Sequence, residues 1–362
     1  MPTPDQLMTA LLAVTDPNTG KDFVSTKALK NLQIDAGRVS FDVELAYPAK
    51  SQHAALRQAL TAAARGVAGV SEVKVSFATH ITAHAVQRGV QLLPNVKNII
   101  AVASGKGGVG KSTTAANLAL ALAAEGAAVG LLDADIYGPS QPMMMGIEGR
   151  PGSEDGKTMD PMENYGVQVM SIGFLIKPDD AMIWRGPMAT QALEQLLRQT
   201  NWQSLDYLIV DLPPGTGDIQ LTLSQRVPMT GAVIVTTPQD IALLDARKAV
   251  VMFEKVGVPI LGLVENMAAH VCSNCGHVEH IFGEGGGKRY ADERGIDYLG
   301  ALPLDMAIRL QADGGKPTVV ADPEGSVAAI YKDVARKVSL KIAAKAKDFS
   351  AKFPTITVSK DT

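Results

Sequence analysis

Two hydrophobic patterns divide the chain near residue 97. Before this point, apolar and polar residues alternate in 39–45 (VSFDVEL) and in 70–77 (VSEVKVSF), with an Ala- and Leu-rich segment between them. A period of two is typical of half-buried strands, whereas the Ala/Leu-rich segment favours a helix. Residues 1–80 are therefore predicted to form a small α+β domain, followed by a linker at 81–96.

After residue 97, the apolar residues come in short continuous runs. The runs are 99–103, 129–132, 207–210, 232–235 and 260–264. Continuous apolar strands that alternate with helical segments indicate a mostly parallel sheet covered by helices on both faces. Such sheets bind ligands at the carboxyl ends of their strands. We expect an α/β domain over 97–345 and a C-terminal tail at 346–362.

A glycine-rich loop follows the first of these strands. Residues 105–112 (GKGGVGKS) match the pattern G-x-x-x-x-G-K-[ST] between a predicted strand and a predicted helix, which predicts a P-loop NTPase. Glycines let backbone N–H groups converge on phosphate oxygens, and the helix N-terminus favours an anion. Lys111 is expected to reach the β- and γ-phosphates of ATP, and Ser112 is expected to ligate Mg²⁺. The predicted nucleotide cradle consists of Gly105, Lys106, Gly107, Gly108, Val109, Gly110, Lys111 and Ser112.

Lys106 gives this loop a second lysine, and the segment resembles the deviant Walker A motif K-G-G-x-x-K-[ST]. In that family, the signature lysine reaches the nucleotide bound to the partner subunit. The resemblance therefore implies a homodimer that sandwiches ATP, with Lys106 and Lys111 both serving catalysis. A solvent-exposed loop lysine is the alternative interpretation of Lys106.

Further polar residues follow the later strands, and the same resemblance gives them roles. Asp133 and Asp135 end the second strand in a segment assigned to switch I, where Asp135 is the candidate that orients the attacking water. Asp211 would hold Mg²⁺ through water, and Gly215 would sense the γ-phosphate as switch II. Asn266 matches a position that recognises adenine in related ATPases. Each residue taken alone also fits a turn or a helix cap.

Composition restricts the class of protein. The chain has 362 residues, a net charge of −3 and 46% hydrophobic residues, which indicates an ordinary globular protein and disfavours one that coats nucleic acid. We expect a cytoplasmic protein without a signal peptide or a membrane span. The 2 cysteines exclude a disulfide-rich scaffold. They also cannot supply the four thiolates of a [4Fe–4S] cluster within one chain.

Both cysteines, Cys272 and Cys275, lie in one C-x-x-C motif, which His270, His277 and His280 flank. Three interpretations compete. The motif can be a redox pair, although it lies deep in a nucleotide-binding domain rather than beside a βαβ start. It can hold zinc together with two histidines of the same chain. It can also supply half of the thiolates for an iron–sulfur cluster shared between two subunits.

Dense matches make residues 97–345 resemble the Mrp/ApbC-type iron–sulfur cluster carrier ATPases. They include DADIYGPSQP (133–142), DLPPGTGD (211–218), ENM (265–267) and the C-x-x-C. Residues 1–80 resemble the small iron–sulfur assembly domain that precedes this ATPase, although they lack the cysteine that some related domains carry. The resemblance implies a homodimer that binds a labile [4Fe–4S] cluster through Cys272 and Cys275.

The same resemblance implies that the cluster comes from an assembly scaffold and passes to apo-proteins, coupled to ATP. An ATP-switched positioning or partition protein is the alternative, and it needs no cysteines. A zinc-stabilised ATPase without a cluster is another.

Two segments carry weaker signals. A predicted helix near the C-terminal end holds Lys332, Arg336, Lys337 and Lys341 at spacings typical of a solvated helix face. Contact with an acidic partner or with nucleic acid is the alternative. Residues 285–287 are three glycines, which predict a flexible loop.

Overall fold

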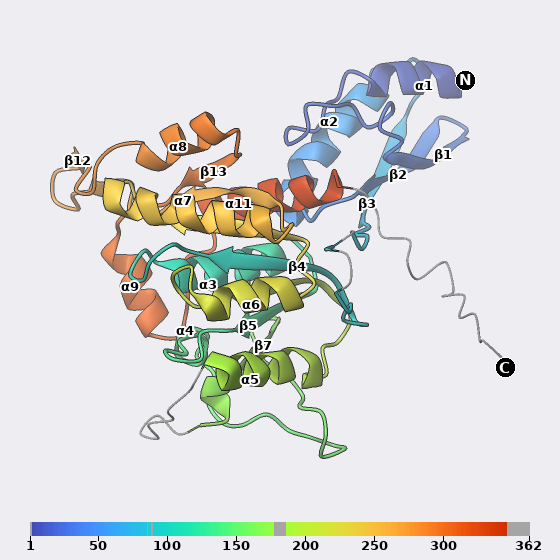
Figure 1. Ribbon diagram of the computed structural model, residues 1–362. Coiled ribbons are helices and arrows are strands. Elements are labelled where there is room, and N and C mark those ends of the chain that lie inside the picture. The colour runs from blue at the N-terminus through green and yellow to red at the C-terminus, as the bar shows by residue number, and fades with distance from the viewer. Residues whose placement is uncertain (1, 85, 88–89, 177–185, 346–362) are drawn as a thin grey trace.

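The computed structural model of the protein describes residues 2–84, 86–87, 90–176 and 186–345. The predicted tail at 346–362 therefore lies outside the described residues. Figure 1 shows a small N-terminal domain, coloured blue, beside a larger body that contains the remaining elements. The two parts have separate sheets, of three strands and of eight strands.

The N-terminal domain is a three-stranded sheet packed against two helices. Its elements are α1 (Pro4–Leu11), β1 (Leu29–Asp35), β2 (Arg38–Leu45), η1 (Lys50–Gln52), α2 (His53–Arg65) and β3 (Glu72–Thr79). The central strand β2 runs antiparallel to β1 and parallel to β3. Val39, Phe41, Val43 and Leu45 are buried, so the predicted period of two places one face of β2 in the core.

The larger body contains an eight-stranded sheet in the order β13-β10-β9-β4-β8-β5-β7-β6. The strands are β4 (Val96–Ala103), β5 (Val129–Asp133), β6 (Met162–Asn164), β7 (Val167–Ser171), β8 (Leu205–Asp211), β9 (Gly231–Thr236), β10 (Ile260–Glu265) and β13 (Tyr298–Ala301). All neighbours pair in parallel except β6 and β7 at one edge. The mostly parallel sheet and its five predicted strands are confirmed.

Helices cover both faces of this sheet. They are α3 (Lys111–Ala124), α4 (Gln141–Met144), η2 (Ile172–Phe174), α5 (Gly186–Gln199), α6 (Asp218–Arg226), α7 (Asp240–Lys255), α8 (Gly286–Arg294), α9 (Met306–Asp313), α10 (Thr318–Ala321) and α11 (Ser326–Ala343). Crossovers between parallel strands are right-handed. The connections β4–α3–β5 and β9–α7–β10 move in opposite directions from the centre of the sheet, so α3 and α7 lie on opposite faces.

The P-loop helix α3 also connects the two domains. Just after α3 ends, the buried Glu125 carboxylate accepts hydrogen bonds from Ser51 of the N-terminal domain, at 3.0 Å from the backbone N and 2.5 Å from Oγ. Arg336 of α11 donates to the same carboxylate at 2.8 Å. The helix α3 therefore runs from the nucleotide loop to the contact between the two domains.

A separate antiparallel hairpin, β11 (His270–Val271) and β12 (Val278–Glu279), follows β10. Among the described residues, no helix combines the length and the apolar character needed to cross a bilayer.

Candidate functional site

The glycine-rich loop lies at the carboxyl end of β4, in the centre of the sheet. Gly108 and Gly110 have φ values of 79° and 81°, a region that glycine occupies without strain. A Cβ atom on Gly105 would overlap the backbone of Asp245 in α7, so the close approach of these two segments requires glycine. At Gly107 and Gly108 a Cβ atom would meet nothing within 4 Å, which leaves an open space above the loop.

Lys111 and Asp211 form a buried ion pair at the centre of this site. Their side chains are only 6% and 0% exposed, and the Lys111 ammonium contacts Asp211 Oδ1. Lys111 Nζ also donates to the Ser112 hydroxyl at 3.2 Å. The structure thus brings Asp211 against Lys111, which lies 100 positions earlier in the chain and also contacts its neighbour Ser112.

Gln141 is a member of this cluster that the sequence analysis missed. Its Nε2 donates to Asp211 Oδ2 at 2.9 Å and to the Ser112 carbonyl oxygen at 3.0 Å. The side chain is fully buried. Its position in the DADIYGPSQP segment was visible in the sequence, but nothing local indicated that it reaches two other loops.

The two switch I aspartates have different environments. Asp133 is fully buried and accepts from the backbone N of Asp135, Ser140 and Gln141 and from Ser171 Oγ at 2.9 to 3.1 Å. It therefore fixes the path of the segment. Burial and the nearby Asp211 raise the pKa of Asp133.

Asp135 is only partly buried, which leaves its carboxylate accessible for the predicted contact with water. Its Oδ1 accepts from the Gly138 backbone N at 3.3 Å. Partial burial raises the pKa of Asp135, although the Lys111 charge opposes this shift. A raised pKa makes a carboxylate a better proton acceptor while it is ionised.

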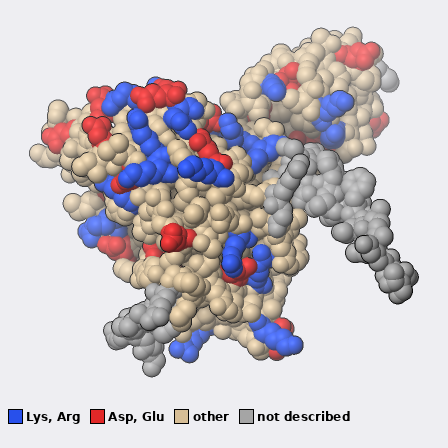
Figure 2. Space-filling model, in the orientation of Figure 1, with Lys and Arg blue, Asp and Glu red and all other residues tan. Residues whose placement is uncertain are grey.

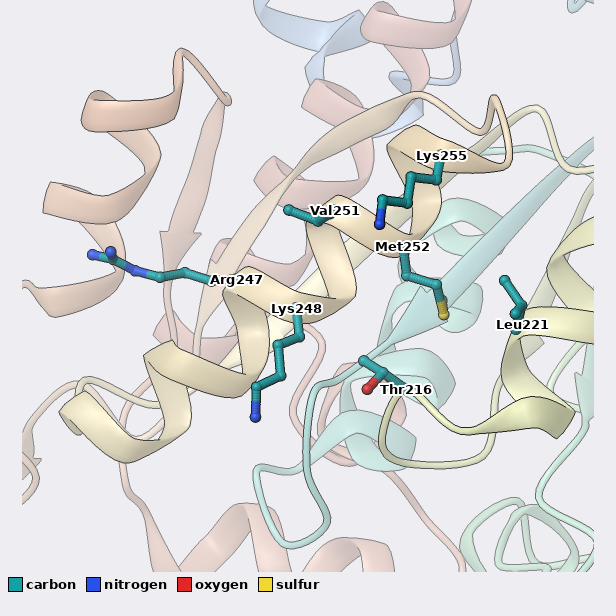
Figure 3. Close-up of a pocket in the computed structure, with 7 residues that line it drawn as sticks. All are labelled: Thr216, Leu221, Arg247, Lys248, Val251, Met252 and Lys255. Carbon is teal, nitrogen blue, oxygen red and sulfur yellow. The ribbon is translucent and has the colours of Figure 1, made fainter.

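Gly215 links the loop after β8 to the P-loop. Its φ of 95° requires glycine, and its N–H donates to the Ser104 carbonyl oxygen at 3.1 Å. The next residue, Thr216, lines a groove of about 520 Å³ between α6 and α7 (Figure 3). Arg247, Lys248 and Lys255 border this groove around an apolar floor, and basic side chains gather on this face of the molecule (Figure 2). The predicted switch II thus borders a basic groove.

Asn266 lies beside the P-loop, although it follows β10. Its Nδ2 donates to the Val109 carbonyl oxygen at 2.8 Å. A Cβ atom on Gly110 would overlap the same amide nitrogen. Asn266 therefore braces the loop in this structure, and its predicted contact with adenine stays a prediction.

Lys106 is half-buried, and no described residue forms an ion pair or a hydrogen bond with its ammonium group. Only its backbone carbonyl oxygen is engaged, as the acceptor of a 2.8 Å hydrogen bond from Ser104 Oγ. This contrasts with Lys111, which has two side-chain partners. Lys106 therefore has a charge that the described part of the chain does not neutralise.

The C-x-x-C motif forms the turn of the β11–β12 hairpin. Gly276 N donates to the Cys272 carbonyl oxygen at 2.8 Å, and Cys272 N donates to the His277 carbonyl oxygen at 2.9 Å. Both thiols are free, and Cys275 is exposed. Backbone N–H groups of Cys275 and Asn274 hold the pKa of the Cys272 thiol below its usual value. The motif therefore holds two free thiols, of which that of Cys275 is exposed.

The flanking histidines do not complete a metal site with these thiols. His270 Nδ1 and His280 Nδ1 lie within hydrogen-bond distance of the backbone carbonyl oxygens of Leu304 and Ala268, at 3.1 and 2.9 Å. Within the described parts of the chain, no three Cys, His, Asp or Glu side chains gather closely enough to hold a metal ion. The described residues of one chain therefore do not assemble the zinc site that was the alternative prediction.

The hairpin and the P-loop share one edge of the sheet. The hairpin follows β10, which is two strands from β4 in the sheet order, or about 10 Å at the usual strand spacing. In Figure 1, β4 points toward the side from which β12 projects. Large apolar side chains on segments at this edge are exposed by 50% to 70%: Tyr137, Ile241, Leu244, Val271, Val278, Ile281 and Met306.

The residues at this edge fit a magnesium–nucleotide complex. The loop glycines leave space for phosphates, and Lys111 supplies a positive charge. Ser112 and Asp211 are oxygen donors of the kind that Mg²⁺ prefers. The buried Ser140 Oγ and Gln141 Oε1 also form no hydrogen bond with any described residue. Fold and site together define a P-loop NTPase.

Comparison with known proteins then gives the family. A model described as "NUBPL iron-transfer P-loop NTPase" matches residues 95–339, and one described as "Iron-sulfur cluster assembly protein" matches residues 4–77. The first match covers more than half of the chain. The chain therefore belongs to the NUBPL iron-transfer P-loop NTPase family, which confirms the resemblance drawn from the sequence.

Individual relatives agree with this assignment. The iron-sulfur cluster carrier protein of Pseudomonas fragi is 63% identical over 269 residues, which is 74% of this chain and 94% of that protein. The carrier protein of Synechocystis is 45% identical over 349 residues, with 94% and 99% covered. Mouse iron-sulfur cluster transfer protein NUBPL is 52% identical over 248 residues, with 68% and 78% covered.

Solved structures agree on the fold. An ADP-bound nucleotide-binding protein of Archaeoglobus fulgidus is 38% identical, with a TM-score of 0.57 over 66% of this chain and 93% of that one. The cell division ATPase MinD of Pyrococcus furiosus, at 24% identity and a TM-score of 0.51 over 67% and 98% of the chains, shares the fold alone.

Proposed function

We propose that the protein is an ATP-dependent carrier that holds a labile [4Fe–4S] cluster between two subunits and passes it to apo-proteins. The observation that carries this proposal is the pair of free thiols, on half-buried Cys272 and exposed Cys275, at the same sheet edge as the nucleotide loop. Relatives named as cluster carrier and transfer proteins support iron–sulfur cargo. A cluster-assembly scaffold is the proposed donor, and the cytoplasm, where thiols stay reduced, is the proposed compartment.

The number of thiols supports a shared cluster. A [4Fe–4S] cluster usually takes four thiolates, and each chain supplies two. No third ligand gathers around them among the described residues. A twofold homodimer repeats the same surface on both subunits and thus provides four thiolates in one place. The exposed apolar side chains at this edge offer the surface that such a dimer would bury.

The nucleotide site supports hydrolysis of ATP. Lys111 neutralises Asp211 here, and we infer that it turns to the β- and γ-phosphates when ATP binds. Ser112 and Asp211 would hold Mg²⁺, which supplies neutralisation of phosphate charge. Asp135 would orient the attacking water, and the Gly215 N–H would respond to the γ-phosphate.

Three further roles complete the proposal. Lys106 would reach across to the nucleotide of the partner subunit, because no described residue of its own chain neutralises it. Asn266 would recognise adenine once it exchanges its bond to the Val109 carbonyl oxygen. Residues 1–80, which contain no cysteine, would serve as a docking module rather than as a cluster site.

Coupling between ATP and cluster follows from their common edge. A cluster bridged by two subunits is held or released by small changes in subunit placement, and a ligand shifts that placement only if it binds one arrangement more tightly. ATP contacted by Lys106 from across the interface would favour the closed arrangement. Loss of the γ-phosphate would weaken it.

Anaerobic reconstitution with iron and sulfide tests the cargo. The proposal predicts about four iron atoms and four sulfides per dimer, with visible charge-transfer absorbance. Cys272→Ala and Cys275→Ala should each lose both. One zinc per monomer without sulfide would reject the cluster.

Lysine variants test the nucleotide site separately. Lys111→Ala should abolish ATP hydrolysis, measured as phosphate release, and unchanged turnover would contradict its role. Lys106→Ala should retain nucleotide binding but weaken nucleotide-dependent dimerisation in light scattering. Lys157→Ala, a substitution of an exposed lysine on another loop, is the matched control.

A further inference from the structure

Gln141 connects three functional segments through a single buried side chain and its backbone. The carboxamide Nε2 donates to Asp211 Oδ2 at the end of β8 and to the Ser112 carbonyl oxygen at the start of α3. The backbone N donates to Asp133 Oδ2 at 3.0 Å. Both amide hydrogens therefore have defined acceptors, one on the predicted metal ligand and one on the P-loop helix.

This arrangement divides the two oxygens of Asp211 between different partners. Oδ1 is held by Lys111, and Oδ2 is held by Gln141. A buried carboxylate needs partners for both oxygens because water does not reach it. When Lys111 turns to phosphate, Gln141 is the described partner that still fixes the direction of the Asp211 carboxylate.

The carboxamide oxygen of Gln141 differs from most buried polar atoms in its hydrogen bonding. Gln141 Oε1 is buried, and no described residue forms a hydrogen bond with it, whereas most buried polar side-chain atoms have a partner. The neighbouring Ser140 hydroxyl is also buried, with no hydrogen-bond partner in the described part of the chain. The carboxamide oxygen needs a donor that the described residues do not supply, and water, which can also accept from the Ser140 hydroxyl, is the simplest one.

We propose that Gln141 is a positioning residue for the metal site. It holds Asp211 in the orientation that receives a hydrated magnesium ion, and its Oε1 accepts a hydrogen bond from the water of that ion. The backbone N–H of Gln141 also donates to Asp133. Metal binding therefore depends on the position of switch I. This inference rests on the proposed binding of magnesium–nucleotide.

A merely structural role for Gln141 makes a different prediction, and Asn164 provides the matched control. Asn164 Nδ2 donates to the Met145 carbonyl oxygen at 2.8 Å, just beyond the other end of α4. It thus anchors the same segment without touching Asp211. If Gln141 only fixes α4, then Asn164→Ala should reproduce the effect of losing the Gln141 amide.

The experiment measures magnesium affinity rather than turnover. Full-length protein is saturated with a fluorescent ADP analogue and titrated with MgCl₂, and the affinity for the same analogue is measured separately in EDTA. Gln141→Met keeps the length of the side chain and removes its hydrogen bonds. We expect at least a tenfold loss of magnesium affinity, with the affinity in EDTA changed less than twofold. Asn164→Ala should leave both values within twofold of the wild type.

Gln141→Glu adds a second test, because it places a carboxylate against Asp211 in place of a donor. It should also lower magnesium affinity at least tenfold, and circular dichroism establishes that each variant is folded. Wild-type magnesium affinity in folded Gln141→Met, or an equal loss in Asn164→Ala, would overturn the positioning role. If the wild type itself shows no magnesium-dependent binding of ADP, the proposed nucleotide function fails first, which is a distinguishable result.

Discussion

Removing the guanidinium of Arg336 gives a large effect that can be worked out from the structure. In Arg336→Met, the fully buried Glu125 carboxylate loses its 2.8 Å ion-pair partner, while the 11% exposed Arg336 side chain is replaced by an apolar one. Removing one partner of a buried ion pair costs about 3–5 kcal/mol. Ser51 still donates two hydrogen bonds to Glu125. We therefore expect the free energy of unfolding to fall by the lower end of this range, about 3 kcal/mol.

Urea denaturation at fixed protein concentration measures this loss. The buried Trp202, whose Nε1 donates to the Leu197 carbonyl oxygen at 3.0 Å, reports unfolding of the P-loop domain. Arg309→Met is the matched control, because it breaks an exposed pair with Asp313 on α9. Such exposed pairs contribute about 0.3–0.5 kcal/mol.

Two further measurements separate the ion pair from general damage. Ser51→Ala should cost about 1 kcal/mol by itself, since it removes only the hydroxyl donor to Glu125. Combined with Arg336→Met, it should show non-additivity, because both donors serve one carboxylate. Equal destabilisation by Arg336→Met and Arg309→Met, within about 0.5 kcal/mol, would refute the reasoning.

Two other predictions concern the loops of the site. Gly110→Ala should lower the affinity for ADP at least tenfold in calorimetry, because the added Cβ would overlap Asn266 Nδ2 and a φ of 81° disfavours alanine. Gly138→Ala is the control and should bind ADP normally, because an added Cβ there meets open space. Wild-type affinity in Gly110→Ala would be contrary evidence. In Cys275→Ser, iodoacetamide should alkylate Cys272 at lower pH than an ordinary thiol, because backbone N–H groups lower the pKa of Cys272 and keep it as thiolate as pH falls. An ordinary thiol pH profile would contradict this.

The sequence predicted the parts of the fold that local pattern determines. The five central strands are continuous apolar runs, and the P-loop is a contiguous motif between a strand and a helix. Strands β6, β7 and β13 contain only three to five residues, too few for periodicity to distinguish them from loops.

Contacts between distant segments were the parts that sequence reasoning could not supply. The C-terminal helix is predicted to present its cations to solvent, but the Arg336 side chain is only 11% exposed and pairs with Glu125, 211 positions away. Lys332 is also largely buried, and its Nζ donates to the Pro323 carbonyl oxygen at 2.7 Å. The contact between the two domains thus includes the Arg336–Glu125 ion pair, which no local spacing in the sequence reveals.

The glycine triplet at 285–287 also has a role that depends on contacts with distant segments. It was predicted as a flexible loop, but its last two residues begin α8. A Cβ atom on Gly286 would lie 2.5 Å from the Pro238 carbonyl oxygen, and one on Gly287 would lie 2.6 Å from Glu265 Oε2. These glycines therefore allow close packing of α8, and a composition rule cannot distinguish this role from flexibility.

The central claim is that one cluster is shared between two chains. Native mass spectrometry of a mixed dimer tests it most directly. A wild-type chain is paired with a mass-tagged chain carrying Cys272→Ala and Cys275→Ala, and both are reconstituted anaerobically with ATP. A shared cluster gives one [4Fe–4S] cluster on each wild-type homodimer and none on the mixed dimer. A mixed dimer that retains half of the metal of the wild-type homodimer would contradict it, because each chain would then bind metal alone.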